Sequence, residues 1–103
     1  MSEDKTISLE TTVVATKEQA SADLGREAAI LNLKNGVYYG LNSVGARIWA
    51  LIQQPRTVRE MREMLVEEYD VDADRCEHDL LMLLRQLAEN TLVDIVEDTA
   101  PHT

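Results

Sequence analysis

Few side chains in this sequence belong to the types that carry out catalysis. The 103 residues include one cysteine, Cys76, and two histidines, His78 and His102. A nucleophilic cysteine needs a neighbour such as a histidine or a cationic cluster that lowers the pKa of its thiol. Cys76 falls instead on an apolar helical stripe, where no such group is placed. We therefore interpret Cys76 as a structural cysteine and not as a nucleophile.

The same region offers one pair of residues of metal-ligand type. Asp74 and His78 are four residues apart, so a helix would place them on one face, whereas the consecutive Glu77, His78 and Asp79 would point in different directions. Two ligands fall short of the number that zinc sites use. We interpret the pair as part of a solvated polar face and predict no metal site.

Motifs for phosphate binding or acyl transfer are missing from the sequence. Gly36, Gly40 and Gly45 are not followed by the Gly-Lys-Ser/Thr of a phosphate loop, and no Gly-x-Ser-x-Gly occurs. Nineteen acidic residues would allow a general acid–base pair almost anywhere, so they are no evidence for one. The sequence predicts a protein with no catalytic residue and no cofactor, which is not an enzyme.

Net charge narrows the class of partner. The chain carries a net charge of −9, with six acids and seven bases in residues 1–59 but thirteen acids and three bases in residues 60–103. An acidic half repels phosphate backbones and anionic membrane surfaces. We therefore expect no nucleic acid and no membrane as partner, whereas a basic or apolar polypeptide remains possible. No apolar run has the length of a membrane span or resembles a signal peptide, and the lone cysteine suits a reducing compartment, so we expect a cytoplasmic protein.

The first half of the chain reads as strands. Residues 11–16, 28–33 and 37–41 are short, rich in β-branched or apolar residues, and the polar segment 17–20 breaks the pattern between the first two. Asn35-Gly36 between two apolar runs indicates a hairpin. A two-residue loop would pair Leu33 with Tyr38, and a longer loop would shift that register.

The second half reads as three helices. The first is expected to begin after Asn42 and to end near Gln54-Pro55, and the second to begin with a capping box at Thr57 and Glu60. Asp72 is the expected cap of the third and longest helix. Residues 92–96 alternate weakly, which is compatible with a short final strand.

This order of elements predicts an α+β fold: a three-stranded antiparallel sheet followed by three helices, similar to a winged helix-turn-helix with its hairpin at the front. The length corresponds to a single domain, residues 1–103, with a core at about 8–97 and flexible ends. Such a small sheet exposes an edge strand, and an exposed edge beside an apolar helix is a site where an extended peptide can add as a further strand.

Several segments together resemble the PqqD-like family. They are Gly25–Leu33, Gly36–Asn42, Val44–Trp49, Thr57-Val58 with Glu60, Glu68–Val71 and Cys76–Leu81. The resemblance covers about residues 8–97. The amino-acid sequences of segments 21–25 and 36–42 are most similar to those of the stand-alone members of lasso-peptide biosynthesis. Arg26 and Asn90-Thr91 depart from the family pattern, in which glycine is more usual near both places.

The resemblance implies a RiPP recognition element, a peptide chaperone that binds the leader peptide of a ribosomally synthesised precursor. In the lasso type the partner is a cysteine-protease-like leader peptidase, and a cyclase acts afterwards. The family's leader adds beside the third strand and lies along the third helix. Carried over to this chain, the implied peptide-binding residues are Val37, Tyr38, Tyr39, Gly40, Cys76, Asp79, Leu80, Leu83, Leu84 and Leu87, with Asp79 at an acidic position common in the family.

Two other functions stay open at this point. A PqqD-like partner of a radical SAM maturase would have the same groove, and co-purification of an iron–sulfur enzyme would distinguish it. A winged-helix DNA-binding regulator would have the same topology, but its recognition helix would have Arg, Lys or Asn near its N-terminus. The expected third helix begins Asp72-Ala73-Asp74-Arg75, which disfavours that alternative.

Overall fold

Strands and helices fill most of residues 7–96, the part of the chain that the computed structural model describes. Four strands come first, and the three helices follow with a short strand between the first two and a last strand after the third. The elements are β1 (Thr12–Ala15), β2 (Gln19–Leu24), β3 (Glu27–Asn32), β4 (Tyr38–Leu41), α1 (Ser43–Leu51), β5 (Arg56–Thr57), α2 (Val58–Tyr69), α3 (Ala73–Glu89) and β6 (Val93–Val96). The predicted α+β class is confirmed, whereas the expected behaviour of the two chain ends falls outside the described residues.

The strands form two separate antiparallel sheets. One sheet has the order β5-β1-β6, with Thr12 opposite both Thr57 and Val96. The other has the order β2-β3-β4. A three-stranded sheet is therefore present beside the helices, but residues 11–16 do not belong to it. The sequence pattern favoured pairing between neighbouring strands, whereas β1 pairs with two strands that come much later in the chain.

Strand β2 was not predicted, because its apolar alternation consists only of Ala20, Ala22 and Leu24, and residues 17–20 were interpreted as a polar break. The polar break is confined to Lys17-Glu18, and the strand begins at Gln19. Most of β2 is exposed, and Leu24 is 60% exposed. Main-chain pairing along the whole length of β3, from Gln19 opposite Asn32 to Leu24 opposite Glu27, holds β2 in place. Side-chain burial, on which sequence patterns depend, contributes little here.

The β3–β4 hairpin has the longer of the two loops considered from the sequence. Leu31 lies opposite Tyr38 and Ile30 opposite Tyr39, so Leu33 does not pair with Tyr38. Within the loop Gly36 alone has a positive φ, of 74°, and its N–H donates to the carbonyl of Asn32 at 2.8 Å. A type I′ turn needs positive φ at both central residues, so Asn35-Gly36 does not form one.

The three predicted helix starts are confirmed. Asn42 caps α1 by accepting a hydrogen bond from the N–H of Gly45, and Asp72 caps α3 through the N–H of Arg75. Thr57 and Glu60 form the expected capping box at the start of α2, with each side chain bonded to the other residue's N–H. Each cap satisfies donors that would otherwise lack a partner at the helix N-terminus.

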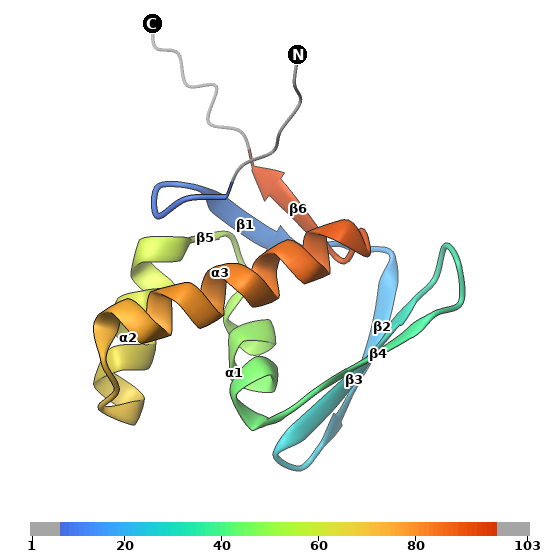
Figure 1. The fold of residues 1–103 in the computed structure, drawn as a ribbon. Coiled ribbons are helices and arrows are strands. Elements are labelled where there is room, and N and C mark those ends of the chain that lie inside the picture. The colour runs from blue at the N-terminus through green and yellow to red at the C-terminus, as the bar shows by residue number, and fades with distance from the viewer. Residues whose placement is uncertain (1–6, 97–103) are drawn as a thin grey trace, which may run out of the picture.

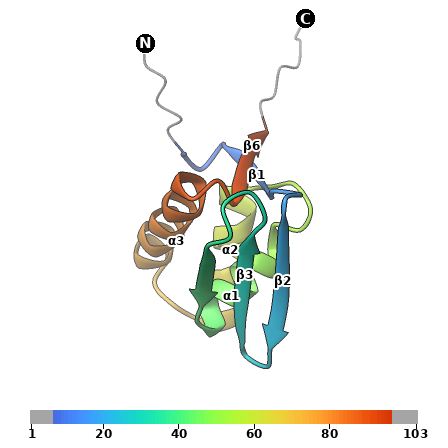
Figure 2. The same ribbon diagram turned by 90° about the vertical axis from the view of Figure 1, so that its right-hand side faces the viewer.

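Helix α3 runs across the molecule beside α1 and α2, and the β2–β3–β4 sheet stands at the other side of α1 (Figure 1). Seen from the sheet side, β4 is the strand nearest to α3 and β2 the farthest (Figure 2). The core between these layers contains the fully buried side chains Val13, Ile30, Ile52, Val58, Met61, Leu80, Leu84, Leu87 and Leu92. Within residues 7–96 there is no helix that is both long enough and apolar enough to span a membrane.

Candidate functional site

A groove lies between β4 and α3, with a volume of about 980 Å³. Its apolar lining comes from all three helices, with Ile48 from α1, Leu65 from α2, and Leu80 and Leu83 from α3. The complete lining is Tyr39, Gly40, Leu41, Asn42, Val44, Gly45, Ile48, Leu65, Tyr69, Val71, Asp72, Arg75, Cys76, Asp79, Leu80, Leu83 and Gln86. A concave, mostly apolar surface with a few polar groups at its rim is typical of a ligand site.

One side of this groove is an edge strand with free main-chain groups. The N–H of Asn32 donates to the carbonyl of Val37, and pairing then continues through Ile30 opposite Tyr39. Main-chain hydrogen bonds alternate along an antiparallel strand, so Tyr39 turns its N–H and C=O toward β3. Tyr38 and Gly40 therefore turn theirs away from the sheet, on the side of α3. An extended chain lying there would find donors and acceptors that have no main-chain partner among residues 7–96.

Charge is concentrated on the rim that the N-terminal half of α3 forms. Asp72, Arg75 and Asp79 line this rim, and the Arg75 and Asp79 side chains approach to 3.8 Å while both remain largely exposed. An exposed pair at that distance contributes little to stability, so both side chains are free to bind other groups. The rim is net negative, because two carboxylates face one guanidinium.

The Cys76 thiol faces the groove but is not chemically activated. Burial raises its pKa, the nearby carboxylate of Asp79 raises it further, and Arg62 opposes these effects. The thiol is therefore protonated at neutral pH, and a protonated thiol is a poor nucleophile. Cys76 is half-buried and acts as a small apolar residue in the groove, in agreement with its interpretation as a structural cysteine.

Tyr39 joins the sheet to α3 across the groove. Its side chain lies on the inner face of β4, and its hydroxyl donates a hydrogen bond to Gln86 Oε1 at 2.7 Å. Burial raises the pKa of Tyr39, so the hydroxyl stays protonated and can donate. Both residues line the groove, and their hydrogen bond marks the end of the groove nearest to the β3–β4 loop.

A second connection holds the hairpin against the end of α3. The buried Asn32 donates from Nδ2 to the carbonyl of Asn90 at 2.9 Å and to Thr91 Oγ1 at 3.0 Å. Thr91 has a left-handed φ of 55°, which is unfavourable for a β-branched residue. The N–H of Leu92 donates to the carbonyl of Leu87, and the N–H of Thr91 donates to the carbonyl of Ala88. These two hydrogen bonds form a Schellman cap at the end of α3. Asn32 thus supports a cap in which threonine occupies the usual position of glycine.

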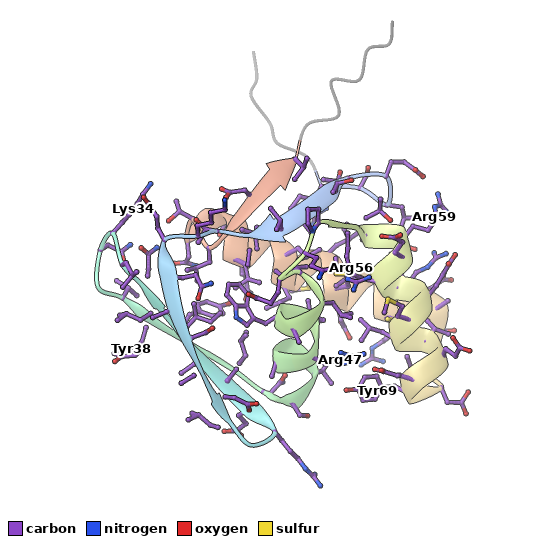
Figure 3. All side chains as sticks on the ribbon, turned by 180° about the vertical axis from the view of Figure 1, so that it is seen from behind. Lys34, Tyr38, Arg47, Arg56, Arg59 and Tyr69 are labelled. Carbon is purple, nitrogen blue, oxygen red and sulfur yellow. The ribbon has the colours of Figure 1, made fainter. Side chains whose placement is uncertain are left out.

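The opposite end of the groove, between α1 and the α2–α3 turn, is held by an ion pair. Arg47 of α1 makes hydrogen bonds of 3.0 and 2.8 Å to the two carboxylate oxygens of Glu68 in α2. Figure 3 shows Arg47 reaching from α1 toward α2, with Tyr69 close by. Val44, Tyr69 and Val71 are each more than 40% exposed at this end, so it is open to solvent.

The predicted site residues fall into three groups in the structure. Six of them line the groove: Tyr39, Gly40, Cys76, Asp79, Leu80 and Leu83. Val37 and Tyr38 are exposed outside it, and the Tyr38 side chain points away from the body of the protein (Figure 3). Leu84 and Leu87 are fully buried in the core. Their side chains support α3 from behind and are not available to a ligand in the groove.

Several lining residues were absent from the sequence prediction. Arg75 and Gln86 follow the same three- and four-residue spacing as Cys76, Asp79 and Leu83, so the helical period alone would have found them. The contributions of α1 and α2, among them Val44, Ile48, Leu65 and Tyr69, depend on how the helices cross. No local pattern in the sequence encodes that crossing.

No candidate metal centre accompanies the groove within the described residues. Across residues 7–96 no group of three or more His, Cys, Asp or Glu side chains is placed to hold a metal ion. His78 is exposed on α3 and does not line the groove, and His102 falls outside the described residues. The groove can therefore bind by shape, apolar contact and main-chain hydrogen bonds.

These features define a class: a small α+β domain with a groove between an edge strand and a helix, the geometry of strand addition. The family model for coenzyme PQQ synthesis protein D (PqqD) matches residues 27–93. The chain belongs to the PqqD family, as the resemblance in its sequence indicated.

A solved structure has the same fold. It is TbiB1 in complex with the TbiA(beta) leader peptide, which aligns with a TM-score of 0.75 and 34% sequence identity. The alignment covers 82% of this chain and 99% of that chain. No curated protein matches the chain.

Proposed function

We propose that this protein is a RiPP recognition element that binds the leader peptide of a lasso-type precursor in the groove between β4 and α3. The observation that carries the proposal is the apolar groove beside the free edge of β4, in a fold shared with a leader-peptide complex. The leader adds as a strand beside Tyr38 and Gly40, which supply main-chain hydrogen bonds. Apolar leader side chains lie against Leu80, Leu83 and Cys76, which supply selectivity.

The test is a calorimetric titration with the synthetic leader of the cognate precursor peptide. A saturable one-to-one isotherm is the expected result. A flat trace with the protein alone and again with the peptidase added would contradict leader recognition. Binding only in the presence of the peptidase would indicate that the enzyme completes the site.

Replacing Tyr38 by proline is expected to weaken leader binding by about tenfold. Proline removes the N–H that Tyr38 turns toward the groove, and its ring occupies space beside the added strand. A hydrogen bond of this kind contributes about 0.5–1.5 kcal/mol. Tyr38→Ala is the matched control, because it removes the exposed side chain but keeps the N–H, and its affinity should stay within about threefold of wild type. Equal losses in the two variants would show that the side chain, and not the strand edge, makes the contact.

Delivery of the leader to a peptidase requires a second surface that remains free when the groove is filled. The outer face of the β2–β3–β4 sheet is such a surface, since cross-strand partners share a face. It carries Ala20, Ala22, Leu24, Ala29, Leu31, Tyr38 and Gly40, with Glu27 as its charged residue. Exposed apolar patches of this kind are typical of protein contacts, and β4 belongs to both this face and the groove. We therefore infer that the leader peptidase docks on this face.

Leu24→Asp is expected to lower affinity for the peptidase by about tenfold and to leave leader affinity unchanged, because Leu24 is on β2, far along the sheet from the groove. The comparison variant reverses charge at Glu63 and Glu67, two exposed carboxylates on α2. It tests whether the acidic helices dock the enzyme instead. Pull-down of the peptidase and cleavage of the precursor are the measurements. Loss of both with the charge-reversal variant alone would overturn docking on the sheet.

The enzyme partner also distinguishes the lasso reading from its alternative within the family. A cysteine-protease-like peptidase, with a cyclase acting afterwards, is the partner that we propose. Co-purification of an iron–sulfur radical SAM enzyme, without a peptidase, would favour the alternative maturase. Leader binding in the groove is common to both, so the titration does not depend on this choice.

A further inference from the structure

The Tyr39–Gln86 hydrogen bond spans the inner side of the groove, beneath the position that an added strand would take. Tyr39 belongs to β4 and Gln86 to α3, and the groove lies between these elements. Figure 2 shows α3 beyond the β4 side of the sheet, and the Tyr39 hydroxyl reaches Gln86 on that helix. Part of the groove's inner face is filled by this ring before any ligand enters.

Strand pairing places one ligand residue directly against the ring. Side chains of directly opposite residues lie on the same face of a sheet, so the residue opposite Tyr39 points inward, toward the ring. Tyr39 turns its own N–H and C=O toward β3, so in antiparallel addition this residue forms a non-hydrogen-bonded pair. Opposite side chains approach most closely in such pairs. A large side chain at that position would overlap the ring.

We propose that Tyr39, held by Gln86, is a size filter that admits only glycine, alanine or serine at the leader residue facing it. This inference rests on the proposed leader binding and adds to it a residue-specific preference. The other inward-facing leader positions meet the apolar lining formed by Leu83, Cys76 and Ile48, and accept larger apolar side chains. The filter therefore fixes the register of the leader as well as its sequence.

The surrounding contacts hold the main chain that carries Tyr39 and Gln86, and the Tyr39–Gln86 hydrogen bond itself holds the ring. The hairpin that carries Tyr39 is anchored through Asn32 to Asn90 and Thr91, directly after α3. Asn90 in turn donates from Nδ2 to the carbonyl of Gln86 at 2.8 Å. The hairpin, the end of the helix and the turn after it are thus connected on the C-terminal side of the Tyr39–Gln86 bond, which limits how far β4 can separate from α3 there.

The experiment is a leucine scan of the leader, one position at a time, with affinities measured by fluorescence anisotropy. With the wild-type protein, one position should carry a small residue and lose about 10- to 100-fold in affinity on replacement by leucine, as expected for overfilling a packed site. Gln86→Ala and Tyr39→Phe each remove the hydrogen bond that holds the ring. In either variant, the affinity for the leader with leucine at that position alone should recover by at least about fivefold. Arg85→Ala, an exposed neighbour outside the groove, is the matched control and should recover nothing.

Two results would overturn the filter. One is that leucine is tolerated at every inward-facing leader position, and the other is that leucine lowers leader affinity equally in the wild-type protein, in Gln86→Ala and in Tyr39→Phe. Gln86 is exposed on α3, so Gln86→Ala is expected to fold even if Tyr39→Phe does not. Failure of the unmodified leader to bind the wild-type protein is a different outcome, which would overturn the proposed function and this inference together.

Discussion

Leu84→Asp is expected to unfold the protein. Leu84 is 0% exposed, so the substitution removes a core side chain, at about 2–5 kcal/mol, and buries a carboxylate without a partner, at several kcal/mol more. Their sum is comparable with the whole stability of a small domain, about 5–15 kcal/mol. Far-UV circular dichroism and urea denaturation are the measurements.

Leu84→Met is the control for that experiment. Methionine nearly conserves the volume of leucine, and such exchanges usually cost less than about 1.5 kcal/mol, so its cooperative unfolding transition should remain. A Leu84→Asp protein that unfolds at the wild-type urea midpoint would mean that Leu84 is not in the core. Loss of leader binding by Leu84→Asp carries no information on the groove.

Leu83→Asp is expected to leave the protein folded and to lower leader affinity by more than about 100-fold. Leu83 is half-buried and lines the groove, so the new carboxylate remains hydrated in the free protein. A bound leader would have to bury that charge against apolar side chains, and central apolar contacts contribute about 2 kcal/mol or more to binding. Calorimetric titration, after a circular dichroism check of the fold, measures the effect.

Met82→Asp is the matched control, because Met82 is the preceding residue on α3, is 45% exposed, and does not line the groove. Its leader affinity should stay within about threefold of wild type. Unchanged binding by Leu83→Asp would remove α3 from the leader site. Similar losses with both variants would indicate an effect of added charge on α3 in general.

The contrast between Leu83 and Leu84 shows where the sequence could predict the site and where it could not. Helical spacing identified the apolar side of α3 and included Leu80, Leu83, Leu84 and Leu87. It could not divide this side between core and groove, because the division depends on where α1 and α2 meet α3. The same holds for Ile48 and Leu65, which reach the groove only through the crossing of the helices.

Local chemistry was a better guide to where elements begin. The caps at Asn42, Thr57 and Asp72 were predicted because each depends on residues within three positions along the chain. Strand β2 lies next to β3 in the chain and was missed because most of its side chains are exposed. The pairing of β1 was missed because its partners β5 and β6 lie far along the chain. Non-local pairing leaves little signature in a short segment.

The pairing of β1 with β6 has a consequence for the order in which the newly made chain can fold. β1 leaves the ribosome before the other described elements, but its longest partner, β6, is the last strand among them. Until β6 emerges, β1 can pair only with the two-residue β5. The β3–β4 hairpin and α3 are complete earlier, and contacts that are local in sequence form sooner than distant ones. The β2–β3–β4 sheet, which forms one wall of the leader groove, can thus form while β1 still lacks its longest partner.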